Sequence, residues 1–134
     1  MAGVYEDQGE YEKAQEYYGK ALAISERVLG PEHPDTATTY NNMAGVYYAQ
    51  GDYEKAQEYC GKALSIRERV LGPEHPDTGA TYNNMAVVYY DQGDYKSAFE
   101  HFEKALAVFK MKLGINHPDT QSTMKWIEAA KAHL

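Results

Sequence analysis

Apolar side chains recur along the chain at spacings of three and four residues, which is the period of an amphipathic α-helix. One such stripe consists of Tyr40, Met43, Ala44 and Tyr47. A second stripe follows Gly51, and its members are Tyr53, Ala56, Cys60, Ala63, Leu64 and Val70. A single helix cannot bury its own stripe, so we expect consecutive helices to pack against each other.

This pair of stripes is repeated along the chain. Pro34, Pro76 and Pro118 lie 42 residues apart, and the segment "LGPEHPDT" at 29–36 returns unchanged at 71–78 and as "LGINHPDT" at 113–120. A fixed period of this length is typical of an array of helical repeats. The chain begins within a repeat, because Met1 is the repeat equivalent of Met43.

The pattern predicts an all-α fold with seven helices and no sheet. The expected helix ranges are 1–8, 10–29, 34–50, 52–71, 76–92, 94–113 and 118–132. We interpret residues 1–134 as a single domain, and its parts are a truncated first unit (1–33), two repeats (34–75 and 76–117) and a C-terminal capping helix (118–134). Acidic and basic residues on the second helix of each unit, as in "SERV" and "RERV", are expected to form a solvated face.

The repeated His-Pro-Asp segment has two possible roles. Proline suits the first position of a helix, and Asp35 places negative charge at the positive end of the helix dipole. A ring nitrogen of His33 then lies where an N-cap acceptor is needed. The alternative is a metal site made by His33, His75 and His117, but ligands on successive loops do not converge on one ion. We therefore interpret the segment as a helix start and expect no metal or cofactor.

Composition narrows the classes of partner. The chain carries 13 basic and 20 acidic residues, a formal charge of −7. Nucleic acids and anionic membranes need clustered basic charge, so neither is expected as a partner. A single cysteine, Cys60, favours a reducing compartment, and no apolar run approaches the length of a membrane span. We expect a cytoplasmic protein that is not an enzyme, because no catalytic triad, phosphate loop or metal spacing is present.

One motif identifies a family. Ala44, Tyr47, Gln50, Gly51, Tyr53 and Ala56, followed by Lys62-Ala63-Leu64, resemble the signature of the tetratricopeptide repeat (TPR). The 42-residue length, the "LG-x-x-HPD" loop and the "NNMA" segment resemble the longer subtype found in kinesin light chains. The resemblance implies a right-handed superhelical α-solenoid of antiparallel helix pairs. It also implies a non-enzymatic scaffold that binds a protein or peptide in a concave groove lined by the first helix of each repeat.

That geometry selects a set of candidate groove residues, which lie opposite the stripes that pack against the second helices. The set comprises Thr38, Asn41, Asn42, Tyr48, Asn83, Asn84, Val87, Tyr90, Asp91, Ser122, Lys125 and Trp126. The asparagines carry a donor and an acceptor each, so they suit the backbone of an extended peptide. The alternative is that one asparagine of each pair bonds to the adjacent repeat and fixes the stacking.

The charges of this surface favour a neutral to basic ligand. Only Lys125 is basic among the groove candidates, whereas Glu6, Asp7 and Asp91 are acidic. A scaffold that binds an extended peptide is therefore the leading hypothesis. The alternative is a structural self-assembly module, or a designed or fragmentary array, with no dedicated ligand.

The two ends of the array differ in their expected protection from solvent. Glu128 and Lys131 replace apolar positions of the earlier first helices, as a capping helix requires. The N-terminal helix 1–8 is expected to be too short to cover its neighbour. Exposed apolar surface at this end predicts a possible homodimer, and the residues expected at its interface are Val4, Tyr5, Leu22, Val28 and Leu29.

Overall fold

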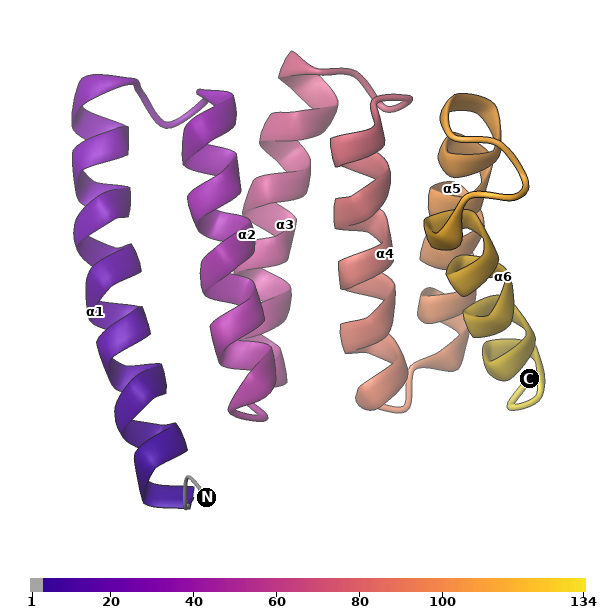
Figure 1. Ribbon diagram of the computed structural model, residues 1–134, viewed down its shortest axis with the longest axis horizontal. Coiled ribbons are helices and arrows are strands. Elements are labelled where there is room, and N and C mark those ends of the chain that lie inside the picture. Colours follow the sequence, from indigo (N-terminus) through magenta and orange to yellow (C-terminus); the bar gives the residue numbers. More distant parts are fainter. Residues whose placement is uncertain (1–3) are drawn as a thin grey trace.

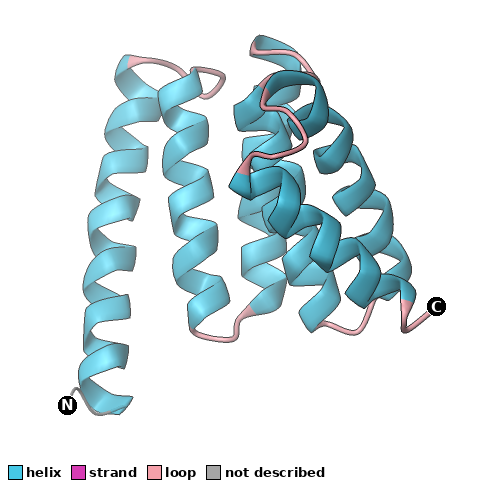
Figure 2. Ribbon diagram, turned by 45° about the vertical axis from the view of Figure 1, so that its right-hand side comes forward, coloured by secondary structure: helices cyan, strands magenta, loops and turns pink. Residues whose placement is uncertain are grey.

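Within residues 4–134, six helices form a row in which neighbours run antiparallel (Figure 1). The computed structural model describes the backbone of residues 4–134 and the side chains of residues 10–134. The helices are α1 (Val4–Val28), α2 (Pro34–Ala49), α3 (Tyr53–Val70), α4 (Pro76–Asp91), α5 (Tyr95–Lys112) and α6 (Pro118–Lys131). Figure 2 shows only helices and short loops over these residues. The predicted all-α solenoid of helix pairs is confirmed.

The helices α2, α4 and α6 begin in the same way. The Nδ1 atoms of His33, His75 and His117 accept hydrogen bonds from the backbone N–H groups two residues later, at 3.0, 3.0 and 3.1 Å. Each proline lies at the start of its helix. A backbone N–H at this position would have no acceptor within the helix, so proline loses no hydrogen bond there. The interpretation of His-Pro-Asp as a helix start is confirmed.

The start of the chain differs from the prediction. We expected a break at Gly9 between helices 1–8 and 10–29, but α1 continues through this position. At the equivalent turns Gly51 and Gly93 have positive φ angles of 83° and 85°. Asp52 and Asp94 then cap α3 and α5 by accepting from backbone N–H groups.

Glu10 stands where those two caps would be, and glutamate is not a favoured N-cap residue. Because no side chain caps a new helix at this position, α1 continues through it. The described residues therefore form six helices instead of seven.

Small side chains bring the two helices of each pair close together. Ala56, Ala63, Ala98 and Ala105 are fully buried, and Phe102 fills the wider space between α5 and its neighbours. Aromatic rings complete the contact between α2 and α3, where Tyr59 stacks on Tyr47 with the ring centroids 5.4 Å apart. The core is therefore a series of small clusters along the row, as expected for a solenoid.

The last helix presents a polar outer face. Ile127 is buried against α5, whereas Glu128 and Lys131 are exposed and their charged groups lie 3.9 Å apart. No helix of the described residues is both long and apolar enough to cross a membrane.

Candidate functional site

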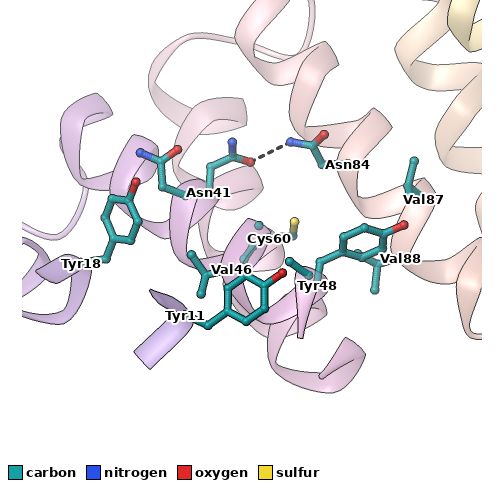
Figure 3. A pocket seen from close by; sticks show the side chains of 13 residues that line it. Tyr11, Tyr18, Asn41, Val46, Tyr48, Cys60, Asn84, Val87 and Val88 are labelled. Atoms are coloured by element: carbon teal, nitrogen blue, oxygen red, sulfur yellow. Dashed lines mark hydrogen bonds between the residues drawn. The ribbon is translucent and has the colours of Figure 1, made fainter. Parts of the chain in front are cut away.

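A hollow of about 450 Å³ lies beside α2 and α4 (Figure 3). Its walls contain both polar and apolar side chains, some of them exposed, such as Asn42 and Asn84. Four helices supply the lining: Tyr11 and Tyr18 come from α1, Asn41, Asn42, Ala44, Gly45, Val46, Tyr48 and Ala49 from α2, Cys60 from α3, and Asn84, Val87 and Val88 from α4. Five of the candidate groove residues therefore meet in one place: Asn41, Asn42, Tyr48, Asn84 and Val87.

The asparagines connect successive first helices. The Nδ2 group of Asn84 donates to Oδ1 of Asn41 at 3.1 Å, and this bond joins α4 to α2 (Figure 3). The hydroxyl of Thr123 donates to Oδ1 of Asn83 at 3.3 Å, and this bond joins α6 to α4. The interpretation that one asparagine of a pair bonds to the adjacent repeat is thus confirmed. Asn42 is exposed and lines the hollow.

A tyrosine and an aspartate form a second link between α2 and α4. The hydroxyl of Tyr48 donates to Oδ2 of Asp91. Burial raises the pKa of Tyr48 to about 12, and the hydrogen bond and negative charge of Asp91 act in the same direction. Tyr48 is therefore a neutral hydrogen-bond donor at physiological pH, and it connects the lining of the hollow to the carboxylate of Asp91.

The C-terminal candidates pack into an aromatic cluster. Trp126 stacks on Phe102 with the ring centroids 5.5 Å apart and meets the edge of Tyr90 at 5.2 Å. The hydroxyl of Tyr90 lies 3.3 Å from Nε2 of His133. This cluster joins α4, α5 and α6, so Tyr90 and Trp126 have a structural role that the sequence did not reveal.

The remaining candidates lie outside the main hollow. Ser122 and Asn83 line a smaller depression of about 200 Å³, together with Asn84. Lys125 is exposed on α6. The hydroxyl of Thr38 accepts from the guanidinium of Arg67 at 3.3 Å.

Arg67 itself corrects one expectation. We placed the "RERV" segment on a solvated face, but Arg67 is only 7% exposed. Its guanidinium donates to the hydroxyl of Thr81 at 2.7 Å and to the carbonyl oxygen of Asp77 at 3.3 Å, besides its bond to Thr38. Burial lowers the pKa of Arg67. The side chain connects α3 to both α2 and α4. Glu68 is half-buried and accepts a hydrogen bond from the hydroxyl of Tyr82, so Arg69 is the charged residue of this segment that fits the solvated face.

The hollow also contains residues that were not groove candidates, among them Ala44 and Cys60 of the packed stripes. Tyr11 and Tyr18 are half-buried on α1, and Cys60 forms part of the wall from α3. The repeat pattern did not indicate this, because Tyr11 and Tyr18 are the equivalents of Tyr53 and Cys60, which lie on the packed stripe. Burial raises the pKa of the Cys60 thiol to about 11, so this group is a protonated thiol at neutral pH.

The residues expected at a dimer interface differ in their exposure to solvent. The side chains of Val4, Tyr5, Glu6 and Asp7 lie outside those that the structure describes. Leu22 was expected to lack cover, but it packs against the cluster of Ala37, Tyr40, Ala63 and Ile66. Val28 and Leu29 are exposed. Self-association through this end stays a prediction.

Among the described residues no group of three or more His, Cys, Asp or Glu side chains is arranged to hold a metal ion. The imidazoles of the three His-Pro-Asp segments each bind their own helix start instead.

Comparisons with known proteins agree with this architecture. A family model described as tetratricopeptide repeat matches residues 1–59 and 35–111. Among solved structures, BtubC (BKLC) from P. vanneervenii is 28% identical with a TM-score of 0.83, over 93% of this chain and 50% of that one. A Podosopora anserina protein described as a kinesin light chain with nearly identical TPR-like repeats, and its single-residue variant, are each 26% identical with a TM-score of 0.86.

The Podosopora anserina alignments cover 96% of this chain and 61% of theirs. The chain therefore spans about half of the first structure's length and about three-fifths of the other two. A comparison with curated proteins found no match.

Proposed function

Because the chain belongs to the tetratricopeptide repeat family, in its kinesin-light-chain-like form, we propose that it binds an extended segment of a partner protein in the hollow along α2 and α4. The fold serves protein interaction in general, and the family is typically one of non-enzymatic scaffolds. The observation that carries the proposal is the hollow of about 450 Å³, whose wall combines amide groups with flat apolar surface.

The amide groups retain capacity for a peptide backbone. An asparagine side chain offers two N–H donors and a carbonyl oxygen with two lone pairs. The bond between Asn84 and Asn41 uses one donor of the first and one lone pair of the second. Asn42 and Asn84 are both exposed at the hollow, so a backbone N–H or C=O of a bound segment has polar partners there.

Apolar and acidic groups would select the side chains of that segment. Val87, Tyr11 and Tyr18 supply apolar area beside the asparagines. Asp91 is exposed next to Tyr48, and the chain as a whole carries a formal charge of −7. The proposed ligand is therefore a neutral to basic extended peptide with an apolar side chain, rather than nucleic acid or an anionic membrane.

A screen of a random peptide library against the chain tests this proposal. We expect selected peptides to be enriched in Lys or Arg and to bind Val87→Glu at least tenfold more weakly. Asn42→Ala should weaken binding by about 0.5–1.5 kcal/mol, the usual net value of one hydrogen bond. Asn42→Ala should not change the unfolding midpoint in urea appreciably, because Asn42 is exposed. Val87 packs partly against the core cluster that contains Ala86 and Phe102, so circular dichroism must show that Val87→Glu remains folded at the temperature of the binding assay.

Met111→Glu is the matched control, because Met111 is an exposed apolar residue on α5. It should leave peptide binding unchanged. Selected peptides that bind Val87→Glu and Asn42→Ala as tightly as the parent chain would place the binding surface elsewhere.

A further inference from the structure

The smaller depression between α4 and α6 differs from the main hollow in its lining. Its volume is about 200 Å³, and Asn84 belongs to the walls of both. Polar side chains make up most of its lining, which consists of Ala80, Asn83 and Asn84 of α4, Phe109 of α5, and Asp119 and Ser122 of α6. A segment bound in the hollow can therefore continue into this depression.

The equivalent place between α2 and α4 contains a guanidinium group. Arg67 of α3 donates from this group to the hydroxyls of Thr38 and Thr81, at 3.3 and 2.7 Å, and to the carbonyl oxygen of Asp77 at 3.3 Å. The three partners come from α2 and α4, and Arg67 is only 7% exposed. Two successive first helices therefore accommodate a buried positive charge between them.

The depression corresponds to this place one repeat later. Its members Ala80, Phe109 and Asp119 lie 42 residues after the threonine partner on α2, the arginine itself and the carbonyl partner on α4, respectively. The hydroxyl of Thr123 donates to the carbonyl oxygen of Asp119 at 2.8 Å, and the equivalent threonine of α4 makes the same bond at 3.0 Å. The surrounding framework is thus retained, whereas the arginine is replaced by phenylalanine.

Phe109 does not supply the chemistry of the guanidinium group. Its ring packs towards Gly79 of α4, where an added Cβ atom would lie 3.1 Å from Cε1 of the ring. A phenyl ring has no hydrogen-bond donor and no charge. The helices α4, α5 and α6 all belong to the described residues, so the difference between the two places lies within the array.

The carboxylate of Asp119 has one possible cationic neighbour among the described residues. This neighbour is Nδ1 of His117, at 3.9 Å. The same nitrogen accepts the backbone N–H of Asp119 at 3.1 Å, so it is the unprotonated nitrogen of the ring. The exposed carboxylate of Asp119 is therefore available to a cation from outside the chain.

Two further oxygen atoms lie in the same depression. Oδ1 of Asn83 accepts from Thr123 at 3.3 Å and has a second lone pair. Ser122 is exposed, and its hydroxyl also accepts. A guanidinium group presents five N–H donors in a plane, which suits several oxygen acceptors better than the single point charge of a lysine.

We propose that the depression between α4 and α6 binds an arginine side chain of the partner segment, with its guanidinium group on Asp119, Asn83 and Ser122. The inference rests on the proposed function, because the same segment lies in the hollow. Val87 of the hollow follows Ala80 of the depression by seven residues on α4, which is about 10 Å along the helix axis. An extended peptide covers that distance in about three residues. The ligand therefore carries an apolar residue and an arginine three positions apart.

The test is an NMR titration of the isotopically labelled chain with two synthetic peptides, acetyl-GSLSSRSG-amide and acetyl-GSRSSLSG-amide. They carry leucine and arginine three positions apart in the two possible orders. We expect one of them to shift the side-chain amide of Asn83 and the backbone amide of Ser122. Replacing its arginine by citrulline, which keeps the shape but removes the charge, should weaken binding about threefold or more, as for an exposed ion pair.

A matched pair of variants isolates the acidic group. Asp119→Asn should weaken binding of the arginine peptide by about the same factor and leave binding of the citrulline peptide unchanged, because the two changes remove the same interaction. Asp35→Asn is the control, since Asp35 is exposed at the equivalent position of α2. It should leave the binding of both peptides unchanged.

The pattern of shifts separates this inference from the proposed function. Shifts at Asn42 and Val87 without shifts at Asn83 and Ser122 would overturn the arginine site and leave binding in the hollow intact. Shifts at Asn83 and Ser122 alone would support the arginine site and count against the hollow. Absence of shifts at Asn83 and Ser122 with both peptides would overturn the inference, as would equal binding of the arginine and citrulline peptides.

Discussion

Arg67 shows how a single position departs from its repeat. Its equivalents are Ser25 and Phe109. The same position of the repeat therefore carries a small polar side chain in the first unit, a charged one in the second and an aromatic one in the third. Among the described residues, Arg67 is the only charged side chain that is buried. Its charge is accommodated by hydrogen bonds to two hydroxyl groups and one carbonyl oxygen. The result is a link between three helices in the middle of the array.

Replacing this side chain should be costly. We expect Arg67→Ala to lower the free energy of unfolding by about 2–4 kcal/mol, since hydrogen bonds to charged groups contribute about 1.5–3 kcal/mol and packing of the aliphatic stem adds to this. Urea denaturation followed by circular dichroism measures the change. Arg69→Ala is the control, because Arg69 is exposed and pairs with Glu32, and it should cost less than about 1 kcal/mol. Equal effects of both variants would contradict this role.

At the scale of the element, the ends of the helices depend on short-range hydrogen bonds. The three first helices use a histidine as N-cap, and the second helices α3 and α5 use Asp52 and Asp94. Where the short cap is replaced by Glu10, the turn is lost and α1 continues. Cap residues therefore decide whether the chain forms one helix or two at these positions.

This account predicts the effect of removing one histidine cap. His75→Ala should lower the free energy of unfolding by about 0.5–2 kcal/mol, the usual value of an N-cap side chain. His75→Asn should recover most of this stability, because the asparagine oxygen accepts the same backbone hydrogen bond. Thermal melts with excess zinc should coincide with melts without it, since a native metal site would raise the melting temperature. Stabilisation by zinc that His75→Ala abolishes would contradict the cap interpretation.

The sequence predicted those parts of the fold that depend on local signals. The spacing of apolar residues, the glycines at the turns and the His-Pro-Asp segments predicted the bounds of α2 to α6 to within two residues of those observed. The sequence did not predict that α1 is uninterrupted. Whether the helix breaks there depends on the N-cap position alone, and Glu10 is a poor N-cap residue. In the candidate site, Asn41, Asn42, Tyr48, Asn84 and Val87, which helix geometry placed on one face, line one hollow, and their role in binding stays a prediction.

Contacts between repeats were harder to foresee. The offset of 43 residues in the Asn41–Asn84, Tyr48–Asp91 and Tyr90–His133 pairs comes from how successive helices are stacked, which no single helix encodes. For the same reason the packing of Tyr90 and Trp126 with Phe102 and the bridging role of Arg67 were not foreseen.

At the scale of the whole molecule, the row of helices presents different surfaces for different contacts. The hollow at α2 and α4 combines amide and apolar groups, the outer face of α6 is polar, and the outer face of α1 is apolar. A solenoid is held together by contacts between neighbouring helices, so these surfaces can bind without rearranging the core. The central claim is that the hollow is the surface that receives an extended peptide.

The most direct measurement is an NMR titration of the isotopically labelled chain with the tightest basic peptide from the library screen. Our account predicts that the largest shifts fall on the side-chain amides of Asn42 and Asn84 and on the methyl groups of Val87. The methyl groups of Met111 and Val70, which are exposed on α5 and α3, should not shift. Shifts confined to α3 and α5, with Asn42, Asn84 and Val87 unchanged at saturation, would contradict it.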